Sequence, residues 1–147
     1  MRLPKNLLTG LRDQLNALVG GDPETRRRYR NAVDALNRAI DSNAWLDGSH
    51  LRNNGDMVFS AVATAARELL RIENPAPSVT AIVATLADTA RELAQIAIDQ
   101  AVVANVNERQ IAAAQQKIQE GDASIASGDF VGAIQSFKHA WQRASQR

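Results

Sequence analysis

Residues 111–141 read IAAAQQKIQEGDASIASGDFVGAIQSFKHAW, and this stretch decides the fold. Helix-forming residues lie on both sides of Gly128, and glycine adopts the backbone conformations that tight turns require. Gly121 before the turn and Ala133 after it have small side chains, which let two antiparallel helices approach closely. Phe137 can fill the space beside them. The stretch therefore predicts a helical hairpin that turns around Gly128.

The same hairpin resembles a single tetratricopeptide repeat. The match has about the 34-residue length of one such repeat and occurs once. Stacked repeats bury their faces against one another, so a lone hairpin must pack against some other surface. We therefore expect the hairpin, residues 107–145, to dock onto the helices that precede it. The positions that carry the resemblance are Gly121, Gly128, Phe130, Ala133, Phe137 and Ala140.

Amphipathic helices are expected before the hairpin as well. Leucines at three- and four-residue spacing predict a first helix over residues 5–19. A second helix is expected to start at Asp22-Pro23, since aspartate caps free backbone N–H groups and proline fits the first helical turn. It is predicted to run to about Ser42. Its expected buried stripe consists of Tyr29, Val33, Leu36 and Ile40.

The middle of the chain contains two further predicted helices and one ambiguous break. Asp56 is the expected cap of the third helix, and Ser78 is the expected cap of the fourth. Pro75 and Pro77 interrupt the chain between these two helices. The fourth helix either ends before Asn107, which would cap a fifth helix, or continues without interruption into the hairpin. The sequence thus predicts one all-α domain over residues 1–147, an antiparallel bundle of five or six helices.

A wider pattern resembles an uncharacterised helical module found near the C-termini of larger bacterial and archaeal exported proteins. It covers most of the chain from about Thr25. Such modules have no assigned chemistry, so the resemblance implies a fold and transfers no active-site residue. The residues that carry it before the hairpin are Trp45-Leu46-Asp47, Val58-Phe59, Leu69-Leu70, Ala87-Asp88 and Leu93-Ala94.

Composition argues against several classes of function. The 147 residues include 17 basic and 16 acidic side chains, a balance that gives no general attraction to nucleic acids or anionic membranes. Cysteine is absent, which excludes disulfides, thiolate nucleophiles and cysteine metal sites. No stretch reaches the ~20 apolar residues of a membrane span. We therefore expect no cofactor, no nucleic-acid partner and no membrane partner.

The N-terminal segment lacks the uninterrupted apolar run of a signal peptide, because Arg12, Asp13 and Gln14 break it. The chain as given is therefore expected in the cytoplasm. If it is a fragment of an exported protein, it is expected outside the cell.

The two histidines, His50 and His139, lack a second histidine at metal-ligand spacing. The turn-rich segment around His50 also offers oxygen ligands for calcium. However, an EF-hand loop that starts at Asp47 needs glycine and glutamate where the chain has Arg52 and Val58. We predict no metal site. A histidine-phosphotransfer role for His50 is one alternative, although the turn residues that follow do not continue a helix.

Charged clusters in the sequence have simpler explanations than catalysis or nucleic-acid binding. The arginines at positions 26, 27, 28 and 30 are expected to form a solvated helix face, with carboxylates in pairing range. Asp88 and Glu92 share a helix face, but Arg91 is adjacent, and exposed ion pairing accounts for all three.

The largest side chains are the remaining candidates for a functional contact. Trp45 and Trp141 are expected mainly in the core, but tryptophan also anchors many protein interfaces. Together with Phe137 they are the predicted partner-binding residues. We expect a non-enzymatic structural or protein-interaction accessory module. Phosphotransfer through His50 and a purely architectural spacer of a larger exported protein are the alternatives.

Overall fold

The computed structural model describes residues 3–72, 75, 77–105 and 107–145. Within these residues the protein is all-α, as predicted, and the helices form an antiparallel bundle. None of the described helices has both the length and the hydrophobicity needed to span a membrane. The elements are α1 (Pro4–Leu18), α2 (Pro23–Ala39), the short 3-10 helix η1 (Ser42–Ala44), α3 (Asp56–Leu70), α4 (Pro77–Val103), α5 (Glu108–Ala126) and α6 (Phe130–Ser145).

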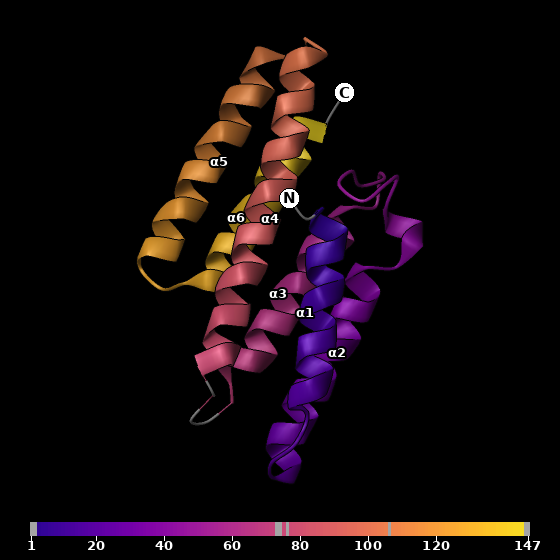
Figure 1. Cartoon of the computed structure of the whole chain (residues 1–147). Coiled ribbons are helices and arrows are strands. Elements are labelled where there is room, and N and C mark those ends of the chain that lie inside the picture. The colour runs from indigo at the N-terminus through magenta and orange to yellow at the C-terminus, as the bar shows by residue number, and fades with distance from the viewer. Residues whose placement is uncertain (1–2, 73–74, 76, 106, 146–147) are drawn as a thin grey trace.

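Successive α-helices run in opposite directions, and neighbours in sequence lie side by side (Figure 1). The α1–α2 pair occupies one side of the molecule and the α5–α6 hairpin the other, with α3 and α4 between them. Helix α3 contacts α2, α4 and α6, and α4 contacts α1, α3, α5 and α6. The middle helices therefore join the two outer pairs.

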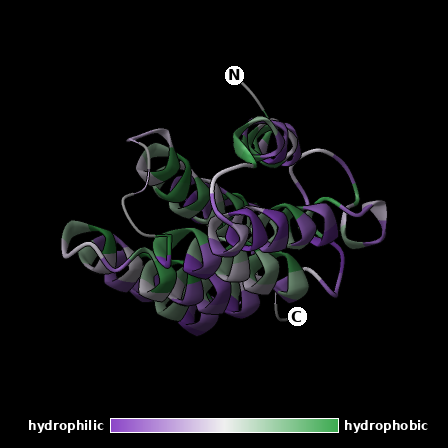
Figure 2. Cartoon of the chain, turned by 90° about the horizontal axis from the view of Figure 1, so that it is seen from below, coloured by the Kyte–Doolittle hydropathy of each residue, from purple (hydrophilic) through white to green (hydrophobic). Residues whose placement is uncertain are grey.

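One continuous core runs through the described helices α1 to α6. Alanine is abundant in it, and its small side chain allows the helices to approach closely while favouring the helical backbone. Hydrophobic and hydrophilic surfaces occur on opposite sides of individual helices (Figure 2). The largest fully buried side chains include Phe59, Phe137, Leu8, Leu15, Leu36 and Leu69.

The C-terminal hairpin forms where the sequence predicts it, and it docks onto the rest of the bundle. Gly128 has φ +84°, in the left-handed region that glycine adopts readily. Gly121 lies directly against the ring of Phe137, which leaves no room for a Cβ. Helix α6 packs against α3 and α4 as well as α5. The prediction that the hairpin buries its apolar face on the preceding helices is thus confirmed.

A break separates α4 from α5, so the chain follows the first of the two predicted alternatives and not the continuous helix. Helix α4 ends at Val103, and Asn105 has φ 56°, a left-handed conformation that asparagine tolerates better than most residues. The side chain of Asn107 accepts a hydrogen bond of 2.9 Å from the backbone N–H of Arg109. The predicted cap of α5 is therefore confirmed.

Three predicted helix boundaries were wrong by one to three residues. Helix α2 ends at Ala39 rather than near Ser42, because the chain turns there into η1. The N-cap of α3 is Gly55, and Asp56 is its first helical residue. Helix α4 begins at Pro77, so Ser78 lies inside the helix and cannot be its N-cap. A favourable capping residue near a helix start does not fix which residue is the cap.

The connection between α2 and α3 is an ordered loop that closes one end of the core, as predicted. Trp45 is buried, and its indole N–H donates a hydrogen bond of 2.7 Å to the carbonyl of Ala39 at the end of α2. Trp45 also forms an isolated antiparallel bridge with Leu51. The backbone N–H of Lys5 donates to the carbonyl of Gly48, which ties α1 to the loop. These contacts fix the position of the residues between them.

Candidate functional site

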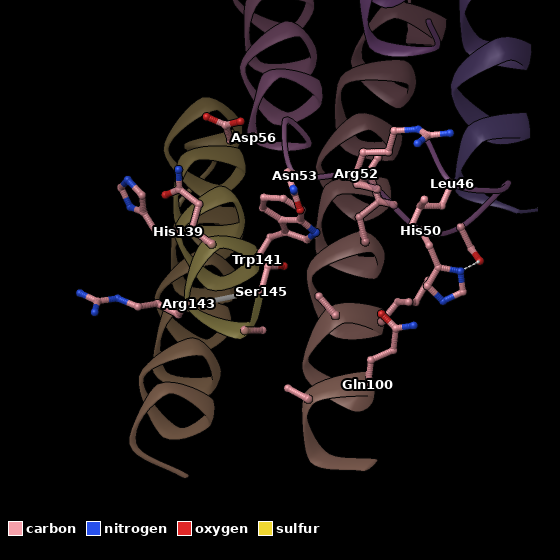
Figure 3. A pocket seen from close by; sticks show the side chains of 18 of the residues that line it. Leu46, His50, Arg52, Asn53, Asp56, Gln100, His139, Trp141, Arg143 and Ser145 are labelled. Atoms are coloured by element: carbon pink, nitrogen blue, oxygen red, sulfur yellow. Dashed lines mark hydrogen bonds between the residues drawn. The ribbon is translucent and has the colours of Figure 1, made fainter. Parts of the chain in front are cut away.

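A groove of about 1370 Å³ lies at one end of the bundle. Most of its lining comes from three segments, the loop after η1 and the C-terminal halves of α4 and α6, and Asp56 of α3 and Lys117 of α5 complete it. Trp141 lies between α4 and α6, with His50 and Gln100 toward α4 and His139 and Arg143 on α6 (Figure 3). We refer to this feature as the α4–α6 groove.

The floor of the α4–α6 groove is apolar and firmly packed. Trp141 is 7% exposed, and its ring stacks at a tilt on Phe59, with centroids 5.9 Å apart. Gly55 approaches the other side so closely that a Cβ there would lie 2.7 Å from Cζ2 of Trp141. Leu93 and Ile96 of α4 continue the apolar floor. These packed side chains make the floor a preformed surface.

The lining carries more positive than negative charge. The basic side chains are Arg52, Lys117 and Arg143, and the carboxylates are Asp47 and Asp56. Lys117 pairs with Glu120 at 3.0 Å. Arg52 uses its Nε–H to hold the carbonyl of Trp45 at 3.0 Å, which leaves its terminal nitrogens available to a ligand.

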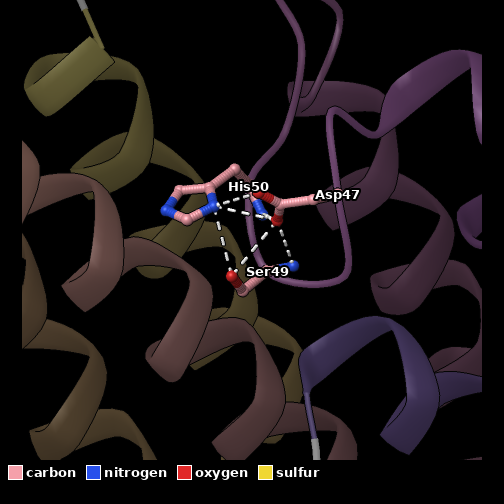
Figure 4. Close-up of polar contacts among 3 residues, drawn as sticks. All are labelled: Asp47, Ser49 and His50. Atoms are coloured by element: carbon pink, nitrogen blue, oxygen red, sulfur yellow. Dashed lines mark hydrogen bonds and ion pairs between the residues drawn. The ribbon is translucent and has the colours of Figure 1, made fainter.

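Asp47 and His50 form a hydrogen-bonded pair on the loop (Figure 4). The Nδ1 atom of His50 lies 2.9 Å from both carboxylate oxygens of Asp47. Asp47 also accepts hydrogen bonds from the backbone N–H groups of Ser49, at 2.8 Å, and His50, at 3.0 Å. The pair is thus held by the loop backbone and does not depend on side-chain packing alone.

The environment of Asp47 stabilises its ionised form. The backbone N–H of Ser49 is the main cause, followed by the imidazole of His50, and together they lower the pKa of Asp47 from 3.8 to about 2. Near neutral pH this side chain is therefore a carboxylate, and it can accept a hydrogen bond from a protonated Nδ1 of His50.

Ser49 does not complete a catalytic relay with this pair. Its Oγ lies 3.2 Å from Nδ1 of His50, on the same ring nitrogen that Asp47 contacts. A serine nucleophile is activated by the nitrogen opposite the carboxylate. The arrangement therefore gives no activated serine, and it leaves Nε2 of His50 as the ring atom directed away from Asp47 (Figure 4).

The second histidine of the groove differs from the first. His139 lies on the exposed side of α6 and has no carboxylate within ion-pair distance among the described residues. Partial desolvation of the ring lowers the pKa of His139 below 6.5, and the nearby charges of Lys117, Lys138 and Arg143 add to this effect. No group of three or more metal-ligating side chains occurs in the described parts of the chain.

The three predicted partner-binding residues all lie in the core. Trp45, Phe137 and Trp141 are 3%, 0% and 7% exposed. Only Trp141 belongs to the groove lining. Phe137 packs against Gly121 inside the hairpin, and Trp45 closes the end of α2. Their shared role in the structure is packing, and a partner-binding role stays a prediction.

One arginine of each charged cluster makes an ion pair to another helix, and Arg27 and Arg28 also pair with Glu24 within α2, as expected. Arg28 is half-buried and pairs with Glu68 of α3 at 2.8 Å, so one member of the predicted solvated face is structural. Arg91 donates from Nε to Asp122 of α5 at 2.7 Å. The Arg91 pairing was expected within α4, and the structure instead places it between α4 and α5. Neither cluster lines the α4–α6 groove.

Sequence reasoning identified His50 and Trp141 but not the groove that contains both. The residues are 91 positions apart, and only the packing of α6 beside α4 brings their segments together. The C-terminal end of α4 offered one signal of such a groove. The apolar residues Ile96 and Val103 occur there beyond the buried residues of the helix, and Val103 is exposed.

No protein-family model, curated protein or solved structure matches this chain.

Proposed function

We propose that the chain is a non-catalytic protein-interaction module and that the α4–α6 groove is its contact surface. The observation that carries this proposal is the groove itself, with its preformed apolar floor at Trp141 and Ile96. Exposed apolar side chains flank it: Leu46 is 63% exposed on the loop, and Val103 is 88% exposed at the end of α4. Exposed apolar surface next to a groove is typical of protein-binding sites.

The occupant we propose is a helical segment of a partner protein with apolar and acidic side chains. Helices bind grooves between helices by burying one apolar face. Acidic side chains of the segment would face Arg52 and Arg143, which are in no ion pair among the described residues. A nucleic acid is not the occupant we propose, because 17 basic and 16 acidic side chains give the chain no general attraction to a polyanion.

The resemblance of the hairpin to a tetratricopeptide repeat supports the same proposal, because such hairpins commonly contact proteins. The resemblance to an accessory module of exported proteins is also compatible with it. A purely architectural spacer is the alternative, and it predicts no partner that depends on the groove.

Site-specific cross-linking tests the proposal. A photoreactive amino acid replaces Leu46 at the groove or, as the control, Leu70 on α3, which is 53% exposed and outside the groove lining. We expect a partner cross-linked from position 46 in cells of the source organism and not from position 70. Purified partner should then bind the chain, and Ile96→Glu should weaken that binding while Leu70→Glu leaves it unchanged.

Three results would contradict this proposal. Equal cross-linking from both positions would point to non-specific contact. Cross-links to the chain itself would identify a second copy as the occupant. No cross-linked protein from either position would favour the spacer.

A further inference from the structure

The two ring nitrogens of His50 differ: Nδ1 contacts Asp47 within the loop, and Nε2 has no such contact. Nδ1 lies 2.9 Å from both oxygens of Asp47, and a carboxylate accepts hydrogen bonds. Nδ1 therefore carries the proton, and in the neutral ring Nε2 carries the lone pair. The side chain of His50 is 30% exposed. Its Nε2 makes no hydrogen bond to any described residue, and His50 lines the α4–α6 groove.

We propose that His50 is a phosphoryl-acceptor site, at which Nε2 takes a phosphoryl group from a donor with a P–N bond. The Nε2 lone pair attacks phosphorus, a new N–P bond forms, and the P–N bond of the donor breaks. The leaving amine departs with its electron pair and its protons. No oxidation or reduction occurs. This site goes beyond the protein-contact role of the groove and does not depend on it.

Asp47 favours this step because of the charge that the ring acquires. When Nε2 binds phosphorus and Nδ1 keeps its proton, the imidazole ring becomes positively charged. The carboxylate of Asp47, held by two backbone N–H groups, faces that charge at hydrogen-bond distance. A carboxylate in this position stabilises an imidazolium and fixes the ring orientation.

The groove also suits the negative charge of a phosphoryl group. Arg52 and Arg143 line the groove and have no ion-pair partner among the described residues, whereas Lys117 pairs with Glu120 and Asp47 contacts His50. Basic side chains around a phosphoryl group attract the dianion and stabilise it after transfer. His139 lines the same groove without a carboxylate partner, which makes it an internal control for the role of Asp47.

The test is incubation of the purified full chain with phosphoramidate near pH 7. Mass spectrometry maps the modified histidine over time, and 31P NMR distinguishes the Nε2 product from the Nδ1 product. We expect His50 to be phosphorylated at Nε2 roughly tenfold faster than His139, because only His50 has a carboxylate to balance the ring charge. His139 is a stringent control, since its lowered pKa keeps it in the neutral, reactive form.

Three variants separate a specific site from general histidine reactivity. His50→Gln should abolish the fast reaction and leave the slow labelling of His139. Asp47→Asn should reduce the rate at His50 to about that of His139, with circular dichroism to show that the fold persists. Ser49→Ala keeps the Asp47–His50 contact and should keep the fast rate. Equal rates at the two histidines, phosphorylation of His50 at Nδ1, or an unchanged rate in Asp47→Asn would each overturn the proposal.

Discussion

The contact between Gly121 and Phe137 shows how a single missing side chain controls the packing of the hairpin. A Cβ at Gly121 would lie 2.7 Å from Cζ of Phe137 and closer still to Cε1, and the ring is fully buried. Gly121→Ala should gain about 1 kcal/mol of helix propensity but lose about 1–3 kcal/mol through overpacking. We therefore expect a net loss of up to about 2 kcal/mol in the free energy of unfolding, measured by urea denaturation.

A double-mutant cycle identifies the cause of that loss. In a Phe137→Leu background the ring that meets the new Cβ is absent, so Gly121→Ala should become neutral or stabilising. If Gly121→Ala costs the same in both backgrounds, the loss does not come from the contact with Phe137.

The ionised state of Asp47, again a single residue, makes the stability of the fold depend on pH. Its folded-state pKa of about 2 lies below the ordinary aspartate value of 3.8, so ionised Asp47 stabilises the fold above about pH 4. That contribution is lost as the pH falls toward 2. Asp47→Asn keeps an acceptor oxygen but removes the charge. We expect wild type to be more stable than Asp47→Asn at pH 5 and the difference to shrink steadily toward pH 2 in urea titrations.

An unchanged difference between pH 5 and pH 2 would mean that the charge of Asp47 does not contribute to stability. Asp13→Asn is the control, because that exposed carboxylate pairs only with the neighbouring Arg12 at 2.9 Å. It should show a smaller dependence on pH.

At the scale of the helices, side-chain caps decide where α5 begins. Asn107 accepts the hydrogen bond of Arg109 N–H, and Asn105 adopts the left-handed conformation that separates α5 from α4. Asn107→Ala should cost about 1 kcal/mol of unfolding free energy, as is typical for the loss of an N-cap. Asn107→Asp, which keeps the acceptor and adds a favourable charge at the helix N-terminus, should preserve stability. A full loss in both variants would show that the cap is not responsible.

The helix pattern was predictable because apolar spacing and strong breakers such as Gly128 act locally. Boundaries were less predictable where two residues could serve the same role. Asp56 and Ser78 are good capping residues, yet Gly55 is the N-cap of α3 and α4 already begins at Pro77. The choice depends on how the preceding loop packs, which a local pattern does not contain.

At the scale of the whole molecule, the groove was not predictable, because it too depends on packing that a local pattern does not contain. The sequence pattern predicts that Trp141 is a core residue and that His50 is part of a turn. Their relation depends on α6 lying beside α4 and on the loop that Trp45 ties to α2. The sequence pattern predicted that the hairpin docks onto the bundle, but not which helices it meets or what surface they form together.

The dependence of the hairpin on the bundle leads to the last prediction. Short helices are marginal in water, and repeat units need a neighbour to bury their faces. Residues of α6 such as Ile134 and Trp141 are buried, and Trp141 stacks on Phe59 of α3. A peptide of residues 107–147 should therefore show weak helicity by circular dichroism and no cooperative thermal transition. Mixing it with a fragment of residues 1–105 should restore helicity beyond the sum of the two spectra, and Trp141→Ala in the peptide should abolish that gain. A peptide that unfolds cooperatively alone would show instead that the hairpin is an independent unit, with α3 and α4 only its neighbours.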